Sequence, residues 1–160
     1  MHPAPSAYGP NLRPHGFPYV VRPAAPGAGN EFTQVVSGEF WVVLLALFVR
    51  LNTDANAASR TLRLEYRDDA DGVYDVMGNP VTYPANTTNE DYSFSIYQPR
   101  GEWEVSTTNL VPLHPLPLPP THDFHIEVTN IQVGDTLTLI RYVVQEFYSD
   151  APSDVGATFG

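Results

Sequence analysis

An unbroken run of ten apolar residues, Phe40 to Val49, limits how this chain can fold more than any other feature of its sequence. A helix that crosses a bilayer needs roughly 20 apolar residues, whereas Gly38 and Glu39 precede this run and Arg50 follows it. No N-terminal targeting segment is visible, because the first residues lack the charged, apolar and small-residue regions of a signal peptide. We therefore expect a protein that does not associate with a membrane.

The composition of the run favours a β-strand over a buried helix, because Phe, Trp and repeated Val fit a pleated strand. Its odd positions remain apolar from Trp41 to Leu51, and its even positions remain apolar from Phe40 until Arg50. The run thus predicts a strand with two dry faces, whereas one face of an antiparallel sheet normally meets water. The second face should be covered by the N-terminal segment or by another subunit.

Most of the remaining chain alternates with a period of two residues, which is typical of half-buried strands. Thr61–Arg67 and Val73–Val76 flank the turn-forming residues Asp68–Gly72, so this region predicts a β-hairpin. Further strands are expected at Tyr92–Tyr97, Trp103–Ser106, His125–Asn130 and Thr136–Tyr148. Around Arg141 the last of these should contain a bulge or cross between two environments. About eight strands without a convincing helix predict an all-β, antiparallel and jelly-roll-like β-sandwich.

The first thirty residues contain seven prolines and cannot form a helix or a central strand. We expect residues 1–30 to be an extended arm, residues 31–150 the sandwich domain and residues 151–160 a C-terminal tail. The arm would become ordered where another surface receives its aromatic side chains, and a disordered leader is the alternative.

A second proline-rich segment, Leu110–Pro120, holds five prolines in eleven residues. Such a segment is stiff and extended and cannot donate a full ladder of hydrogen bonds. We expect a strap that lays its leucines over the chain's own sandwich or over a neighbour, and a ligand for an SH3-type groove is the alternative.

Charge and residue content exclude several functions. The 18 acidic residues outnumber the 8 basic residues and give a formal net charge of −10, which argues against nucleic-acid binding. The absence of cysteine rules out disulfides, thiolate zinc sites and cysteine nucleophiles. His122 and His125 would lie on opposite faces of a strand, and the acidic turn lacks the terminal glutamate of a calcium loop.

No catalytic pattern is visible either. There is no nucleophile elbow and no phosphate-binding loop, and no pair of carboxylates is singled out for glycoside hydrolysis. We expect a protein that is not an enzyme and that has no catalytic residue, cofactor or metal. The dry second face instead predicts a homo-oligomer, with a trimer favoured. The candidate interface residues are Tyr8, Phe17, Tyr19, Phe40, Val42, Leu44, Phe48, Leu113, Leu116 and Leu118.

Three motifs carry a resemblance to a known group. Val36–Trp41 leads into the apolar strand, Leu51–Arg60 leads into the next strand, and Gly134-Asp135 precedes a final strand that ends in Glu146-Phe147-Tyr148. Over about residues 30 to 150 this order resembles small tailed-bacteriophage virion proteins, in which a "GE-W" strand start is followed by "T-(D/S)-A-x-A-x-R". The two proline-rich segments depart from that group.

The resemblance implies a non-enzymatic virion component. The expected role is a capsid decoration or cement protein, which is made in the host bacterial cytoplasm, binds the major capsid protein on the capsid exterior and stabilises the lattice. A tail-associated or adhesin-like carbohydrate-binding module is the alternative, and a small β-sandwich enzyme is a third class. A flat platform of exposed aromatic side chains would favour the adhesin, and a pocket with convergent carboxylates would favour the enzyme.

Overall fold

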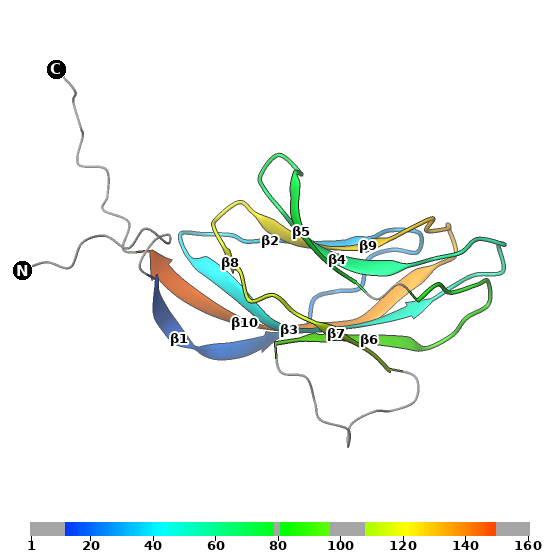
Figure 1. Cartoon of the computed structure of the whole chain (residues 1–160), viewed down its shortest axis with the longest axis horizontal. Helices are drawn as coiled ribbons and strands as arrows, with labels where there is room; N and C mark the ends of the chain where they lie inside the picture. Colours follow the sequence, from blue (N-terminus) through cyan, green and yellow to red (C-terminus); the bar gives the residue numbers. More distant parts are fainter. Residues whose placement is uncertain (1–11, 79–80, 97–107, 150–160) are drawn as a thin grey trace, which may run out of the picture.

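The apolar run forms most of a twelve-residue strand, β3 (Trp41–Asn52), in the larger of two stacked sheets. The computed structural model describes residues 12–78, 81–96 and 108–149, and these residues form an all-β sandwich without a helix (Figure 1). The β-sandwich prediction is therefore confirmed. The expected strand at Trp103–Ser106 and the tail at residues 151–160 lie outside the described residues.

Ten strands are described, and two of them, β2 and β8, are short. Besides β3 they are β1 (Leu12–Val21), β2 (Phe32–Val35), β4 (Leu62–Arg67), β5 (Val73–Gly78), β6 (Glu90–Ser95), β7 (Thr108–Pro112), β8 (Pro117–Leu118), β9 (Asp123–Val128) and β10 (Thr136–Ser149). The six-stranded sheet has the order β1-β10-β3-β6-β7, with β8 also paired to β3, and the four-stranded sheet has the order β2-β9-β4-β5. All pairs are antiparallel except β6–β7, and the predicted hairpin is β4–β5.

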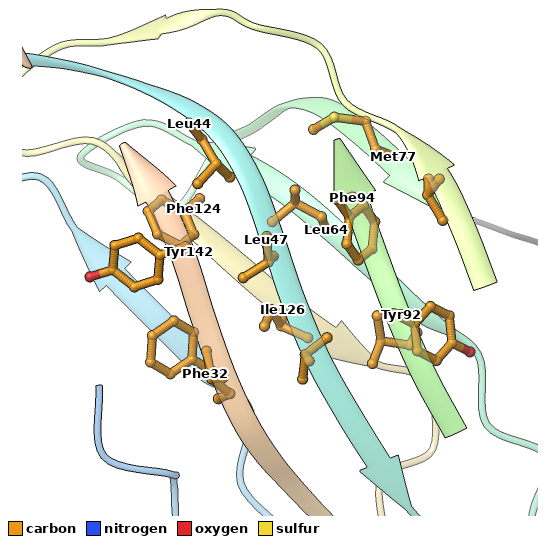
Figure 2. Packing of buried hydrophobic residues seen from close by; sticks show 14 of the residues in the cluster. Phe32, Leu44, Leu47, Leu64, Met77, Tyr92, Phe94, Phe124, Ile126 and Tyr142 are labelled. Atoms are coloured by element: carbon orange, nitrogen blue, oxygen red, sulfur yellow. The ribbon is translucent and has the colours of Figure 1, made fainter. Parts of the chain in front are cut away.

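A β-bulge in β3 reverses which of its side chains face the core. Ala46 pairs with Val143 and Leu44 pairs with Val144, so Leu45 is an extra residue without a counterpart on β10. Leu44 and Leu47 are both buried in the core although their positions differ in parity (Figure 2). The expectation that odd and even positions keep separate faces along the whole run is therefore wrong, because the bulge moves each face by one residue.

The bulge predicted around Arg141 is confirmed. The register of β10 against β3 shifts between Thr138 and Arg141, and Leu139 between them has a φ of 51°. This left-handed conformation is uncommon for a leucine, and it leaves the Leu139 side chain 56 % exposed. The last strand thus changes its inward-facing residues partway along its length.

The core lies between the two sheets (Figure 2). Side chains from β3, β6 and β10 meet side chains from β2, β4, β5 and β9, and the ring centroids of Phe124 and Tyr142 lie 5.0 Å apart across the sheets. The larger sheet contributes Leu44, Leu47, Tyr92, Phe94 and Tyr142, and the smaller sheet contributes Phe32, Leu64, Met77, Phe124 and Ile126.

Part of the expected N-terminal arm belongs to the sandwich. Strand β1 pairs along β10 from Leu12↔Ser149 to Val21↔Tyr142, so the sheet begins at residue 12 and the expected domain boundary at residue 30 is too late. Prolines 14 and 18 are accommodated because β1 is an edge strand with a register shift between His15 and Tyr19. Removal of residues 1–30 would therefore strip the edge of β10, whereas removal of residues 1–11 would leave the described sheet whole.

The proline-rich strap also packs on its own sandwich. Strand β7 lies parallel to β6, and β8 pairs with β3 at Val42 and Val43. Leu113 and Leu118 are buried in the core, whereas Leu116 is 40 % exposed. The strap therefore lays at least these two leucines over the chain's own sandwich.

Candidate interaction surfaces

The outer face of the larger sheet is apolar around β3. Five apolar side chains of this strand lie outside the core cluster: Trp41, Val43, Leu45, Ala46 and Phe48. Across the sheet, Ala46 pairs with Val143 on one side and with Ser95 on the other. The run therefore has a second apolar face, but the bulge at Leu45 changes which of its residues lie on that face.

Two arginines frame a hollow on this outer face. The guanidinium carbon of Arg141 lies 4.3 Å from the centroid of the Phe48 ring. Val21 pairs with Tyr142, so the next residue, Arg22, follows in register toward Arg141. Two adjoining cavities, of about 370 and 290 Å³, share both arginines. We call this region the arginine hollow, and its residues are Val20, Arg22, Ala46, Phe48, Leu139, Arg141 and Val143.

These two arginines differ from the other arginines whose side chains the structure describes. Arg50 pairs with Asp91 at 2.6 Å, and Arg67 pairs with Asp123 at 2.9 Å. Arg63 and Arg60 also bind carboxylates, Glu65 and Asp135 among them. Arg22 and Arg141 form no ion pair within the described part of the chain. The arginine hollow is thus a local basic site on an acidic protein.

A second surface gathers aromatic side chains where β1 begins and β10 ends. His15 stacks on Phe40 with ring centroids 4.6 Å apart, and Tyr148 meets both rings edge-on. In the adjacent irregular part of β1, Phe17 is 90 % exposed. We call these four residues the aromatic corner. The rings of His15 and Phe40 stack while that of Tyr148 lies edge-on to both, so the three rings do not lie in one plane as a flat platform for carbohydrate would require.

Tyr19 lies beside this corner but points toward the groove between the sheets. Its hydroxyl donates a hydrogen bond of 2.6 Å to Oε1 of Glu146, and this bond together with partial burial raises the pKa of Tyr19 to about 12. The groove has a cavity volume of about 80 Å³, and Gln34, Phe124 and Tyr142 help to line it. Tyr19 therefore serves as an internal partner of Glu146.

The outer face of the smaller sheet is polar and ion-paired. Glu65, Asp123 and His125 point outward, yet each is less than a tenth exposed because neighbouring side chains cover it. The His125 ring lies 2.8 Å from Oγ1 of Thr33 and 3.2 Å from Oε2 of Glu31. Burial, followed by the charge of Arg67, lowers the pKa of His125 below its ordinary value.

Glu65 is shifted in the opposite direction. Burial raises the pKa of Glu65, and the hydrogen bond and negative charge of Glu127 add to that increase. Arg63 contacts Glu127 and lies 2.8 Å from Oε1 of Glu65, which offsets part of the repulsion between the two carboxylates. These contacts explain how acidic side chains are accommodated in a covered outer face.

The shift of His125 predicts how stability depends on pH. As the pH falls below the ordinary His value of 6.5, the unfolded chain binds a proton that the folded chain does not. The wild type should therefore lose up to about 1.4 kcal/mol per pH unit from this group, until the lower pKa of the folded state is reached. His125→Gln should remove that part of the slope, as measured by urea unfolding between pH 7.5 and 5.0.

Glu65 has the opposite sign, because its folded-state pKa is raised and the folded chain takes up its proton first as the pH falls. Since Glu65 is present in both proteins, the difference between the two slopes reports on His125. Identical slopes, or a wild type that gains stability relative to His125→Gln on acidification, would contradict the assignment.

Two of the three motif segments, Leu51–Arg60 and Gly134-Asp135, meet in a buried clamp beside the turn between β9 and β10. Arg60 is fully buried and binds Asp135 through Nε and Nη2, each at 2.9 Å, and Asp54 at 2.6 Å. Its Nη1 donates to the carbonyl oxygens of Asn56 and Ala58. A Cβ at position 134 would lie 2.7 Å from that of Asp54, which explains the glycine there. The motif residues of these two segments therefore hold loops together.

The part of the chain that the structure describes contains neither a metal-ligand cluster nor a membrane-spanning helix. There, no three His, Cys, Asp or Glu side chains are arranged to hold a metal ion. Nor does any helix in residues 12–78, 81–96 and 108–149 have the length and apolar character needed to cross a bilayer.

The structure separates the candidate interface residues into three groups. Phe17, Phe40, Phe48 and Leu116 retain exposed or half-buried side chains on outer surfaces. Leu44, Leu113 and Leu118 lie in the core, and Val42 packs against it, so their assignment to an interface is corrected. The bulge at Leu45 accounts for two of these corrections, and the pairing of the strap accounts for the others. Tyr19 is 44 % exposed, although its hydroxyl contacts Glu146. Tyr8 lies outside the described residues.

The arginine hollow was not expected from the sequence. A signal for it exists, because Arg141 interrupts an apolar strand and is the residue around which a bulge was predicted. Its pairing with Phe48 depends on the register between β10 and β3, which joins residues more than ninety positions apart. Sequence periodicity does not specify such a register when both faces of a strand are apolar.

The chain matches no protein-family model, and no curated protein or solved structure is significantly similar to it. The two surfaces and the motif clamp therefore carry the functional inference. The resemblance to tailed-phage virion proteins remains a hypothesis.

Proposed function

We propose that this protein is a non-enzymatic structural protein of a tailed-bacteriophage particle. Its role is that of a capsid decoration or cement protein, which binds the major capsid protein on the outside of the head and stabilises the lattice. The motif resemblance supports this role, and two of its three segments build the Arg60 clamp, which joins loops.

The observation that carries the proposal is the aromatic corner. Phe17 is 90 % exposed and follows His15 by two residues, and the His15 ring packs with those of Phe40 and Tyr148. A large apolar side chain that is almost completely in water, beside further aromatic rings, is typical of an anchor that becomes buried in a complex. Exposed aromatic anchors contribute much of the binding energy at protein interfaces.

The chain also enters and leaves the sandwich at this corner. Leu12 pairs with Ser149, so the residues before β1 and those after β10 start from neighbouring positions. The segment before β1 contains Tyr8 and several prolines, which reduce the entropy lost when an extended segment binds. We assign capsid attachment to this segment together with the aromatic corner.

Binding to undecorated capsids of the parent phage tests this proposal. Phe17→Ser should weaken binding about thirtyfold, because loss of a buried aromatic anchor commonly costs about 2 kcal/mol. Deletion of residues 1–11 should weaken binding as well, while the described sheet remains intact. Bound copies are measured by co-sedimentation over a range of protein concentrations.

The matched control is Val133→Ser. Val133 is 82 % exposed but lies before β10, at the opposite end of that strand from Ser149. This variant should bind like the wild type. Equal binding by wild type and Phe17→Ser would remove the corner from the contact. A protein that binds no capsid but binds glycans would instead support the tail-associated or adhesin-like alternative.

A further inference from the structure

We infer that the arginine hollow binds the β4–β5 tip of a second copy of this chain, so that copies associate head to tail. We define the tip by Asp69, Asp71, Val73, Tyr74 and Val76. This inference goes beyond the proposed function, because it takes up the homo-oligomer expected from the sequence and names the contact between copies. It does not require a capsid.

The two arginines of the hollow line the same cavities, and no carboxylate in the described part of the chain pairs with them. Arg22 directly follows Val21, the last residue of β1, and lines both cavities together with Arg141. Two like charges that lie close together repel each other. The chain has 18 acidic residues, and several described carboxylates pair with other arginines, but none of the described carboxylates pairs with these two. A carboxylate supplied from outside would remove this repulsion.

The geometry of Arg141 suits such a carboxylate. Its guanidinium lies 4.3 Å from the centre of the Phe48 ring, which is the distance of a cation–π contact. An arginine that packs on an aromatic ring in this way is held in place, while its N–H groups remain available to a carboxylate, which two of them can bind at once. Phe48 therefore positions Arg141 for an acidic ligand.

The surroundings of the arginines require an apolar partner as well. Val20 and Leu139 are 57 % and 56 % exposed, and Ala46 and Val143 line the same cavities. Exposed aliphatic side chains on both sides of two cations would be covered by a ligand that combines carboxylates with apolar side chains. The chemical class of the ligand is thus an acidic and apolar protein segment.

The β4–β5 tip of the same chain has this chemistry. The side chain of Asp71 is 83 % exposed, and its nearest cation, Arg67, is 3.9 Å away. Asp69 is exposed, whereas Asp68 accepts hydrogen bonds from the backbone of Ala70 and Gly72 and is occupied within the turn. Directly after the turn, Val73, Tyr74 and Val76 are each nearly half exposed.

The two surfaces belong to different sheets, which determines the type of assembly. β5 lies in the smaller sheet and the hollow lies on the outer face of the larger sheet, so the two are in opposite layers (Figure 1). A symmetric contact between two hollows would bring arginines together and is disfavoured. Contact between a hollow and a tip is heterologous, and such contacts produce closed rings or open chains.

Two complementary variants test the inference without any particle. The hollow variant carries Arg22→Gln and Arg141→Gln, and the tip variant carries Asp69→Asn and Asp71→Asn. Wild type should form species heavier than a monomer in sedimentation velocity, and each variant alone should self-associate at least about tenfold more weakly. An equimolar mixture should form a one-to-one dimer, because each variant retains the surface that the other lacks.

The control is Glu39→Gln, which removes an exposed carboxylate away from the tip and should assemble like the wild type. Circular dichroism and urea midpoints check that every variant is folded. A monomeric wild type at all concentrations, variants that assemble as the wild type does, or a mixture no heavier than its components would each overturn the inference. Capsid binding is measured separately. The proposed function can therefore be contradicted while the contact between copies is confirmed, and the contact can be contradicted while the proposed function is confirmed.

Discussion

Arg60→Met is expected to lower the free energy of unfolding by about 3–5 kcal/mol. Arg60 and Asp135 both have side chains with 0 % exposure, and they are joined by two hydrogen bonds of 2.9 Å. Removal of the guanidinium leaves the Asp135 carboxylate buried without its cation, which is costlier than loss of the contact alone. Since domains of this size are stable by about 5–15 kcal/mol, urea unfolding should show a large shift of the midpoint.

Arg50→Met provides the matched control. Arg50 forms a comparable ion pair with Asp91, but the two side chains are 29 % and 14 % exposed, so water can solvate the carboxylate that remains. We expect a small loss of stability from this variant. If both variants lose the same stability, the burial of the Arg60 clamp is not what makes it important.

Leu47→Ala is expected to lower the free energy of unfolding by about 2–5 kcal/mol, because it creates a cavity between the sheets. Leu47 is 1 % exposed and belongs to the core cluster. Leu45→Ala should cost clearly less, since Leu45 is the extra residue of the bulge and lies outside that cluster. Urea unfolding of the two variants compares the same substitution, Leu to Ala, at two odd-numbered positions of one strand.

This pair of variants tests the bulge directly. A regular strand would place Leu45 and Leu47 on the same face, and truncation of either would then have similar effects. Leu44→Ala extends the comparison, because Leu44 is fully buried although it has the opposite parity from Leu47. Equal losses for Leu45→Ala and Leu47→Ala, with a small loss for Leu44→Ala, would show that the strand is regular.

The fold class was predictable wherever apolar and polar residues alternate strictly. The β4–β5 hairpin follows from such alternation on both sides of an Asp- and Gly-rich turn, and both features depend only on local sequence. Strand β1 was not predictable in the same way. Its prolines correctly excluded a central strand, but its place at the edge depends on pairing with β10, which lies at the far end of the chain.

The surfaces were predictable only in part. Phe17 and Phe48 are large apolar residues in segments whose partners were uncertain, and the structure keeps both at outer surfaces. Burial of a charged residue leaves no comparable signal in the sequence. From the sequence alone, Arg60 could not be distinguished from an arginine in a loop that is exposed to water. Its ligands come from a loop before β4 and a turn before β10, and only the folded chain brings them together.

The pairing of Leu12 with Ser149 also determines how the domain would respond to mechanical load. Tension applied through both ends of the described chain would act across β1 and β10 and not along them. Their hydrogen bonds would then break one pair after another, as in unzipping, and would not have to shear together. A decoration protein that is tethered at this corner to a shell under internal pressure would release strain by peeling β1 from the sheet edge, while the remaining strands stay packed.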